Sequence, residues 1–337
     1  MSRPFSHLRA HEPMRRARRL LLILGLLAPF LLSGSAALAQ SWPQRTVKFL
    51  LPLGPGSGVD IGARLLADRL SARWGQPVVV ENRPGGDGIV AIGAFASAHD
   101  DHLLLVTPTS SFTAHPYLHD NLPYNPSDLL PIARVSNTLI TIAASTSLEA
   151  GSLQQLVAQV RAQPGKLNWA GVTGALDFLF AGFLQRNGLA MTKVPYRNPV
   201  EAANDLAEGR VQMYMAALAI VRPQLQTGKI KLLAVTNSLR APAAPDIPTV
   251  KEAGYGELTF DGLVGLFGPS GMPNELRERI AADIRSIVAA DPLIGKRLVA
   301  TGQILNISGP AEFARATEEQ RDKVATIAHE LGIKPTH

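Results

Sequence analysis

The sequence predicts an α/β protein with two lobes, and three observations support this prediction. Strand-like apolar runs alternate with helix-like amphipathic runs along most of the chain, which is typical of largely parallel sheets. Glycine- and proline-rich turns separate these runs. The sequence contains neither an internal repeat nor a low-complexity linker, so we expect a chain that crosses between two lobes rather than two tethered domains.

The composition excludes several classes of protein. The chain has 337 residues, of which 46% are hydrophobic and 18% are charged, so it is long and apolar enough for two domain-sized cores. The sequence has no cysteine, which excludes a disulfide scaffold, a thiolate zinc site and a cysteine nucleophile. The formal charge is +6, but six arginines and Glu12 give residues 1–39 a net charge of +5. The remaining residues carry +1, and we expect no nucleic-acid partner.

Residues 1–39 have the pattern of a cleaved signal peptide. Arginine-rich residues 14–19 precede an apolar run at 20–32, which is shorter than the about 20 residues that a membrane-spanning helix needs. Ala37-Leu38-Ala39 forms a cleavage site before Gln40. Met14 is an alternative start to Met1. We therefore expect an exported protein.

The first predicted element is a strand at Val47–Leu51. It ends at Pro52 and a glycine-rich turn. A helix at 60–74 follows, with Asp60 as its N-cap and leucines at helical spacing. The same patterns predict strands at 77–80, 103–106, 139–144, 167–170, 211–215, 229–235 and 258–267, and helices at 153–163, 178–187, 200–208, 276–290 and 311–331.

The segment 51–60, LPLGPGSGVD, joins the first predicted strand to the first helix. Its glycines allow a tight turn, and the helix start adds unpaired N–H groups and a positive dipole end, which together favour an anion. An ordinary strand-to-helix turn is the alternative. A dinucleotide site is a competing hypothesis because Glu81 ends the next strand. However, Val59 and Ile61 break the G-x-G-x-x-G pattern, and no P-loop lysine follows.

Two further loops follow predicted strands, at 107–111 and at 171–174. Ligands of open α/β sheets bind at the carboxyl ends of strands, where the hydroxyl groups of these loops can donate to a carboxylate. Capping of a following turn is the alternative for the loop at 107–111. We expect Asp177, just beyond the second loop, to cap the next helix.

Catalytic patterns are absent from the sequence: no G-x-S-x-G, H-E-x-x-H or S-x-x-K motif has suitable partners. His99 and His102 lie in a polar segment that we expect to be solvated. His115 and His119 are four residues apart, but Pro116 argues against a shared helix face for a metal. We predict a binding protein without catalytic residues, cofactor or metal.

Together these segments resemble the periplasmic receptors of tripartite tricarboxylate transporters, also called the Bug family. The resemblance covers residues 43–336 in order and spacing. The segments that carry it are 47–60, 75–86 (GQPVVVENRPGG), 122–126 (LPYNP), 164–168 (PGKLN), 194–197 (VPYR), 228–237, 245–250 (PDIPTV) and 252–254 (EAG).

The resemblance implies the type II periplasmic-binding-protein fold, in which two α/β lobes are joined by two crossing segments and the ligand cleft lies between them. Lobe one would comprise residues 41–140 plus 266–337, and lobe two residues 141–265. The crossings would lie near 140–145 and 260–267.

The resemblance also implies a small carboxylate as ligand. The positions of this chain that match the ligand-binding loops of the family are Pro55, Gly56, Ser57, Gly58, Asp60, Thr109, Ser110, Thr173, Gly174, Tyr196 and Arg197. Two departures make lobe two less polar than in many relatives. Residues 175–179 replace a serine-rich stretch that ends in histidine, and Ala216 and Ala217 replace an acidic residue. These changes favour a monocarboxylate with an apolar or aromatic body.

We therefore expect a monomeric, periplasmic solute receptor that captures a small carboxylate for the membrane components of a tripartite tricarboxylate-type transporter. The alternative is an exported α/β enzyme that acts on a small organic acid. Turnover of the bound acid would distinguish the enzyme from the receptor.

Overall fold

A computed structural model describes residues 42–335 of the chain. The predicted signal peptide and its cleavage site lie outside the described residues. Across the part that is described, none of the helices combines the length and the apolar character needed to cross a bilayer. Both sheets belong to the unit that begins at Arg45.

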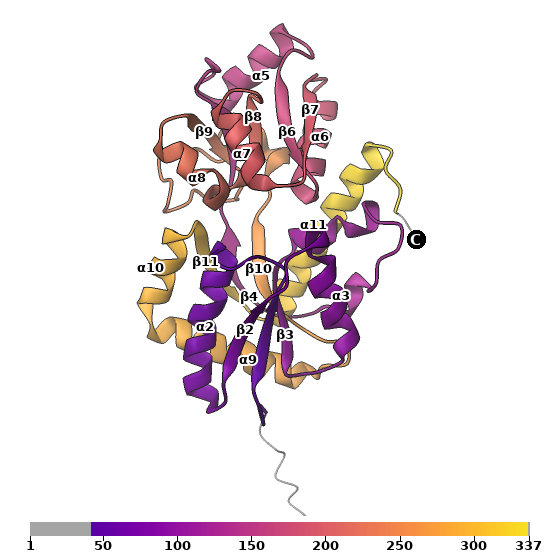
Figure 1. Ribbon diagram of the computed structural model, residues 1–337, viewed down its shortest axis with the longest axis vertical. Coiled ribbons are helices and arrows are strands. Elements are labelled where there is room, and N and C mark those ends of the chain that lie inside the picture. Colours follow the sequence, from indigo (N-terminus) through magenta and orange to yellow (C-terminus); the bar gives the residue numbers. More distant parts are fainter. Residues whose placement is uncertain (1–41, 336–337) are drawn as a thin grey trace, which may run out of the picture. The chain divides into compact units, whose positions relative to one another are not determined.

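The first sheet has six strands in the order β11-β4-β10-β3-β1-β2 (Figure 1). Strand β1 pairs in parallel with β2 and β3, whereas β10 runs antiparallel to β3 and β4, and β11 runs antiparallel to β4. The strands are β1 (Val47–Leu51), β2 (Val78–Asn82), β3 (Leu103–Pro108), β4 (Leu130–Thr138), β10 (Gly262–Gly268) and β11 (Gln303–Ser308). The helices of the same chain regions are α2 (Gly58–Trp74), α3 (Ile89–Ala98), α4 (Ser110–Thr113), α9 (Asn274–Ala290), α10 (Pro292–Ala300) and α11 (Pro310–Glu330).

The second sheet has five strands in the order β7-β6-β8-β5-β9. Strand β6 pairs in parallel with β7 and β8, and β5 runs antiparallel to β8 and β9. The strands are β5 (Ile140–Ser145), β6 (Asn168–Val172), β7 (Thr192–Tyr196), β8 (Met213–Ala217) and β9 (Ile230–Val235). The helices are α5 (Leu153–Ala162), α6 (Ala175–Arg186), α7 (Pro199–Ala207) and α8 (Leu218–Gln226).

The prediction of largely parallel sheets is wrong, because both sheets are mixed. Strand–helix–strand units leave successive strands parallel. Strands β5 and β10 instead follow the connections between the two sheets. A chain that enters a sheet from its carboxyl edge has to run against the parallel strands. The pattern of apolar residues within a strand contains no information about this direction.

Several elements were not predicted from the sequence, namely α3, α8, α10, β4 and β11. Helix α8 contains Pro223, which the residue pattern alone treats as a helix breaker. Strand β4 ends in Ser136-Asn137-Thr138, of which Ser136 and Asn137 are buried. Its burial comes from its neighbours β10 and β11 rather than from apolar alternation in its own sequence.

Helix α11 contributes to the cores built on both sheets. Near its N-terminus, Phe313 packs with the cluster that contains Leu50 and Phe267 of the first sheet. Near its C-terminus, Val324 and Ile327 pack with the cluster built on the second sheet. We keep the division into two lobes as a proposal, with α11 shared between the cores.

We expect the substitution Gly265→Ala to destabilise the fold. A Cβ at Gly265 of β10 would lie 2.4 Å from the carbonyl oxygen of Ala133 and 2.4 Å from the ring of Phe313. Overpacking of this kind costs about 1–3 kcal/mol. The melting temperature should fall by roughly 2–12 °C, measured by circular dichroism. The control is Gly54→Ala, where an added Cβ meets no atom within 4 Å. Equal melting temperatures of the two variants would contradict the prediction.

Candidate functional site

One cleft is lined by loops from both sheets and has a volume of about 420 Å³. The first sheet contributes the loops that follow β1, β2 and β3, and the second sheet contributes the loops that follow β6, β7 and β8. Thr138, Ile140 and Gly262, where the chain passes between the sheets, also line the cleft. The cleft is thus built at the strand ends where open α/β sheets bind ligands.

The loop after β1 presents the N-terminus of α2 to the cleft. Ser57 is the N-cap, and its hydroxyl group accepts a hydrogen bond from the Asp60 N–H at 3.2 Å. Gly56 has a φ of 81°, which favours glycine. The N–H groups of Gly58 and Val59 precede the first hydrogen bond within the helix, and both residues line the cleft. The start of α2 therefore offers donors and a positive dipole end to a ligand.

The prediction that Asp60 is the N-cap is wrong, because the helix begins two residues earlier. Asp60 lies in the first turn and is 2% exposed. Its carboxylate accepts hydrogen bonds from Gly56 N (2.9 Å), from Asn82 Nδ2 (2.9 Å) and from Arg64 Nε (3.1 Å). Asp60 thus fixes the shape of the loop and does not line the cleft.

Two helices of the second sheet add further N-termini. Helix α6 starts after Gly174, and Ala175 and Leu176 of its first turn line the cleft. Helix α8 presents Ala219 and Ile220 of its first turn. Neither N-terminus has a side-chain cap. Three helices therefore direct unpaired N–H groups and positive dipole ends toward one cleft, which favours an anion.

Asp177 does not have the predicted capping role. The N-cap of α6 is Gly174, and Asp177 lies in the first turn. Its carboxylate forms an ion pair with Lys193 at 2.6 Å. Burial raises the pKa of Asp177, although the hydrogen bond and the charge of Lys193 oppose this rise. The carboxylate therefore binds Lys193 of β7 instead of capping the helix.

Arg197 is the cationic side chain of the cleft. It follows β7 directly, and its side chain is exposed. Within residues 42–335 its guanidinium group has neither an ion pair nor a hydrogen bond. An arginine in this state is available for a carboxylate, which it can hold with two parallel hydrogen bonds.

His115 is a buried, neutral member of the cleft wall. Its Nε2 lies 3.2 Å from the carbonyl oxygen of Asp87, which can only accept, so Nε2 carries the proton. Its Nδ1 then accepts a hydrogen bond from the hydroxyl group of Tyr124. Burial lowers the pKa of His115 to about 4, and the nearby His119 adds to the effect. His115 is therefore uncharged at neutral pH.

Six of the eleven residues predicted for the site line the cleft, and five do not. The six are Ser57, Gly58, Ser110, Thr173, Gly174 and Arg197. Pro55 and Gly56 lie exposed in the loop before α2. Asp60 and Thr109 are buried, and the Thr109 N–H donates to the carbonyl oxygen of Leu263 at 2.9 Å. Tyr196 donates its hydroxyl hydrogen to Asp205 Oδ2 at 2.6 Å, and burial and Asp205 raise the pKa of Tyr196 to about 12.

Sequence reasoning missed Asp87, His115, Gln303 and the start of α8 as parts of the cleft. Asp87 directly follows segment 75–86, which contributed only to the family resemblance. His115 was considered only as a metal ligand. Gln303 begins β11, which the sequence pattern did not predict. The loops after β3 and β6 were chosen because ligands bind at the carboxyl ends of strands. The same rule applied to the loop after β2 would have included Asp87.

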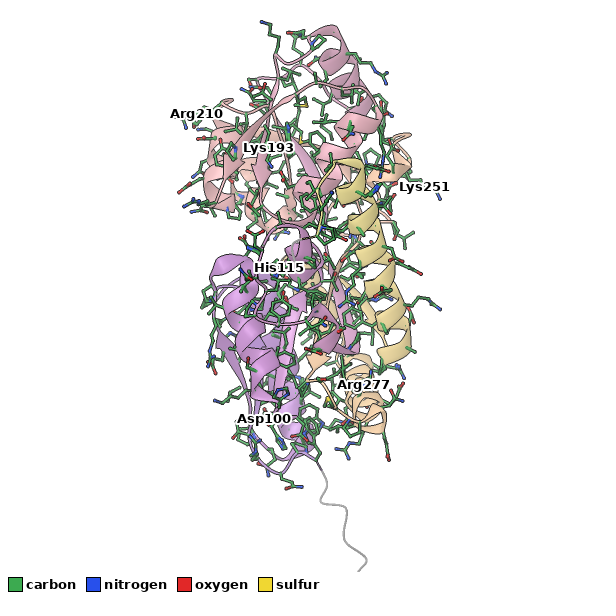
Figure 2. The ribbon with its side chains drawn as sticks, turned by 90° about the vertical axis from the view of Figure 1, so that its right-hand side faces the viewer. Asp100, His115, Lys193, Arg210, Lys251 and Arg277 are labelled. Atoms are coloured by element: carbon green, nitrogen blue, oxygen red, sulfur yellow. The ribbon has the colours of Figure 1, made fainter. Side chains whose placement is uncertain are left out.

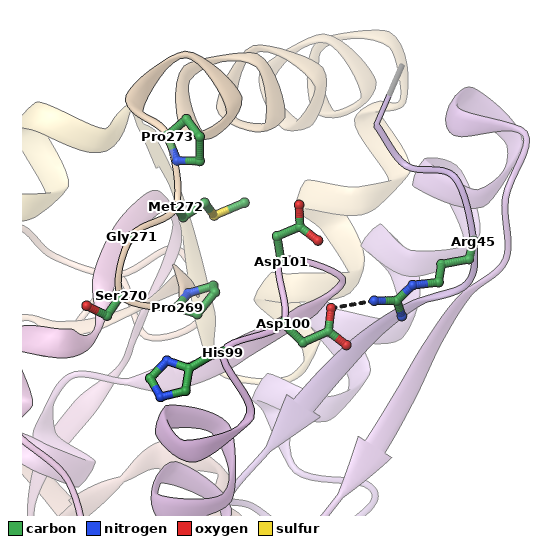
Figure 3. Close-up of a pocket in the computed structure, with 9 residues that line it drawn as sticks. All are labelled: Arg45, His99, Asp100, Asp101, Pro269, Ser270, Gly271, Met272 and Pro273. Carbon is green, nitrogen blue, oxygen red and sulfur yellow. Dashed lines mark hydrogen bonds and ion pairs between the residues drawn. The ribbon is translucent and has the colours of Figure 1, made fainter. Parts of the chain in front are cut away.

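A second hollow lies near the start of β3 and is lined by Arg45, Asp100, Asp101 and residues 269–273 (Figure 3). Its charged groups bind one another: Arg45 pairs with Asp100 at 2.6 Å, as the dashed line in Figure 3 marks. His102 is 7% exposed and lies 2.6 Å from Asp101, so the prediction that it is solvated is wrong. We assign no ligand to this hollow.

Comparison with known proteins gives the family. The sequence profile of the tripartite tricarboxylate transporter family receptor matches residues 62–333. A UPF0065 protein of Bordetella bronchiseptica is 31% identical over 336 residues, which cover 98% of each chain. This chain belongs to the tripartite tricarboxylate transporter receptor family.

Solved structures of periplasmic proteins resemble this receptor over most of its length. The R. palustris protein Rpa4515 with adipate has a TM-score of 0.74 and 26% identity, and the match covers 87% of this chain and 99% of that one. The periplasmic binding protein BugD has a TM-score of 0.71 and 26% identity, with the same coverage. MatC from Rhodopseudomonas palustris with bound malate has a TM-score of 0.71 and 25% identity, covering 85% and 99%.

These matches confirm the predicted periplasmic-binding-protein fold and the predicted family. The family and its structural neighbours are solute-binding proteins, not enzymes. The alternatives of an exported enzyme and of a dinucleotide-binding enzyme are therefore set aside for this receptor.

We expect the carboxylate of Asp60 to stabilise the receptor in a pH-dependent way. Burial alone would raise its pKa, but hydrogen bonds from Arg64, Gly56 and Asn82 outweigh burial and hold the pKa below its ordinary value. Such a group stabilises the fold above its unfolded pKa of about 4, and this contribution is lost as the pH falls through the folded value. Asp60→Asn should lower the free energy of unfolding at pH 7 by about 1–3 kcal/mol.

Urea unfolding at several pH values between neutral and about 3 tests this expectation. The variant should lose less stability on acidification than the wild type. The control is Asp68→Asn on the same helix, because the Asp68 side chain is 71% exposed. If wild type and Asp60→Asn show the same acid sensitivity, the hydrogen bonds of Asp60 do not stabilise its charge.

Proposed function

We propose that this chain is a periplasmic receptor that captures a small carboxylate and delivers it to the membrane components of a tripartite tricarboxylate-type transporter. The observation that carries the proposal is the convergence of three helix N-termini and Arg197 on one cleft. Oriented N–H groups and a planar guanidinium group are the donors that a carboxylate prefers. The structures of relatives with adipate and with malate support the proposal, since both ligands are carboxylates.

The residues that we propose to contact the ligand are those predicted site residues that line the cleft. Arg197 would bind the carboxylate, together with the N–H groups at Gly58 and Gly174. The hydroxyl groups of Ser57, Ser110 and Thr173 would donate further hydrogen bonds. Each of the six residues lies in a loop that follows a strand or at the first residue of the helix that comes next.

We infer that the ligand is a monocarboxylate with an apolar or aromatic body. Arg197 is the single side chain among the described cleft residues that is cationic at neutral pH, so one carboxylate is matched by charge. The wall from the second sheet is largely apolar and includes Leu176, Met215 and Ile220. Its Ala216 and Ala217 offer no polar side chain to a second acidic group.

The cleft position supports capture by closure of the two lobes, residues 41–140 plus 266–337 and residues 141–265. A ligand held by loops from both sheets would favour the closed arrangement, because it binds that arrangement better than the open one. The predicted signal peptide would bring the chain to the periplasm before it folds.

We expect carboxylate ligands to raise the melting temperature. A ligand that binds only the folded state stabilises it by about 2.7 kcal/mol at a hundredfold excess over its dissociation constant. This corresponds to an increase of roughly 5–10 °C for a chain of this size. A thermal-shift screen of mono- and dicarboxylates should give a few clear hits, and nicotinamide dinucleotides should give none. A screen without carboxylate hits would contradict the proposed function.

We expect Arg197→Lys to weaken binding of the best acid from this screen by about tenfold or more, because lysine keeps the charge but loses the planar pair of donors. Isothermal titration calorimetry measures the affinity. The matched control is Arg161→Lys on α5, whose side chain is exposed and lies outside the cleft. Unchanged affinity in Arg197→Lys would show that Arg197 is a surface residue without a role in binding.

A further inference from the structure

We propose that Asp87 sets the charge selectivity of the cleft, so that the receptor rejects acids with a second carboxylate. The inference rests on the proposed function and deepens it. It starts from an acidic residue in a cleft that otherwise favours anions. Asp87 lies between β2 and α3 and lines the cleft with Gly85 and Gly88.

The backbone at Asp87 is unusual for a residue with a side chain. The segment Gly85–Gly88 has four successive positive φ angles, and the value at Asp87 is 55°. Glycine adopts such angles at no steric cost, whereas side chains other than those of asparagine and aspartate rarely do. The conformation explains the three glycines of this segment, but it does not require an aspartate at position 87.

A buried pair of side chains holds this segment in place. His115, which Figure 2 labels, lies in the short helix η2 (His115–Tyr117). It donates its Nε2 hydrogen to the carbonyl oxygen of Asp87 at 3.2 Å. Tyr124 donates its hydroxyl hydrogen to the other ring nitrogen. His115 is 2% exposed and Tyr124 is also buried. The backbone of Asp87 is therefore fixed at the wall, and its short side chain stays close to that point in every rotamer.

The negative charge of Asp87 has no cationic partner among the described cleft residues. In the described part of the chain, its carboxylate forms no hydrogen bond and no ion pair. The cleft residues that can carry charge are Arg197, Asp87 and the neutral His115. A single carboxylate on the ligand pairs with Arg197. A second carboxylate would find no second cation and would share the cleft with Asp87.

The cleft is small enough for the negative charge of Asp87 to repel a second carboxylate of the ligand. Taken as a sphere, a volume of about 420 Å³ is about 9 Å across, which is close to the Debye length of about 8 Å at physiological ionic strength. Solvent ions therefore do not fully screen two like charges inside the cleft, and closure around a ligand reduces screening further. Asp87 can instead accept a hydrogen bond from an uncharged donor, such as a hydroxyl group, at that end of the ligand.

Calorimetry with matched pairs of acids tests the proposal: hexanoate against adipate, and 4-methylbenzoate against terephthalate. Within each pair the two acids share a carbon skeleton and differ in the second carboxylate. The wild type should bind the monoacid of a pair at least tenfold more tightly than the diacid. In Asp87→Asn this ratio should shrink at least tenfold, since asparagine keeps the backbone preference and removes the charge. Added salt should shrink the wild-type ratio but not that of the variant.

The matched control is Asp68→Asn, which makes the same change in net charge on the exposed face of α2 and should leave the ratio unchanged. A ratio that stays unchanged in Asp87→Asn would overturn the role of Asp87 while the proposed function stands. A wild type that prefers diacids would overturn both the role of Asp87 and the inferred monocarboxylate, while the capture of a small carboxylate stands. A wild type that binds no carboxylate, in calorimetry or in the thermal-shift screen, would refute the proposed function itself and this inference with it.

Discussion

The hydrogen bonds of Asn237 join the segments through which the chain passes between its two sheets. This side chain is 1% exposed. Its Oδ1 accepts from Ile140 N at 3.0 Å, and its Nδ2 donates to Thr138 O at 3.1 Å and to Asp261 Oδ1 at 3.3 Å. The start of β5, the end of β4 and the approach to β10 therefore meet at one amide group. These segments also line the cleft, so its base is held by this group.

The rest of the cleft depends on where that junction places the strand ends. Parallel strands β1, β3 and β6 end near it, and the helices that follow start there. Uncapped helix starts are costly when buried without partners, because their N–H groups stay unpaired. An anion bound in the cleft would accept hydrogen bonds from these groups. The same geometry would account for the carboxylate ligand that we propose and for the stabilisation that we expect from it.

Helix α11 limits how the two cores can move. Ile327 packs so closely against α6 that a Cβ at Gly182 would lie 2.7 Å from its side chain. Arg186 of α6 forms an ion pair with Glu330 at 2.7 Å. The other end of the helix belongs to the core of the first sheet through Phe313. The closure that we propose would have to preserve these contacts or break them, in addition to bending the segments at Asn237.

The sequence by itself determined most elements and the loops that bear polar groups. Apolar runs and turn residues predicted β1, α2, β3 and β6, and the loops after these strands contribute Ser57, Ser110 and Thr173 to the cleft. These features are local, since a few neighbouring residues decide strand, helix or turn. The order and spacing of short segments such as 75–86 and 245–250 were also enough to indicate the family.

Only the tertiary structure decided which loops face one another. Strand direction, the burial of β4 and the position of β11 depend on pairing between segments far apart in the chain. The place of Asp87 in the cleft depends on a hydrogen bond to His115, 28 residues away. Such pairings are selected by the packing of the whole fold, because each gains free energy only when the other segments are already in place.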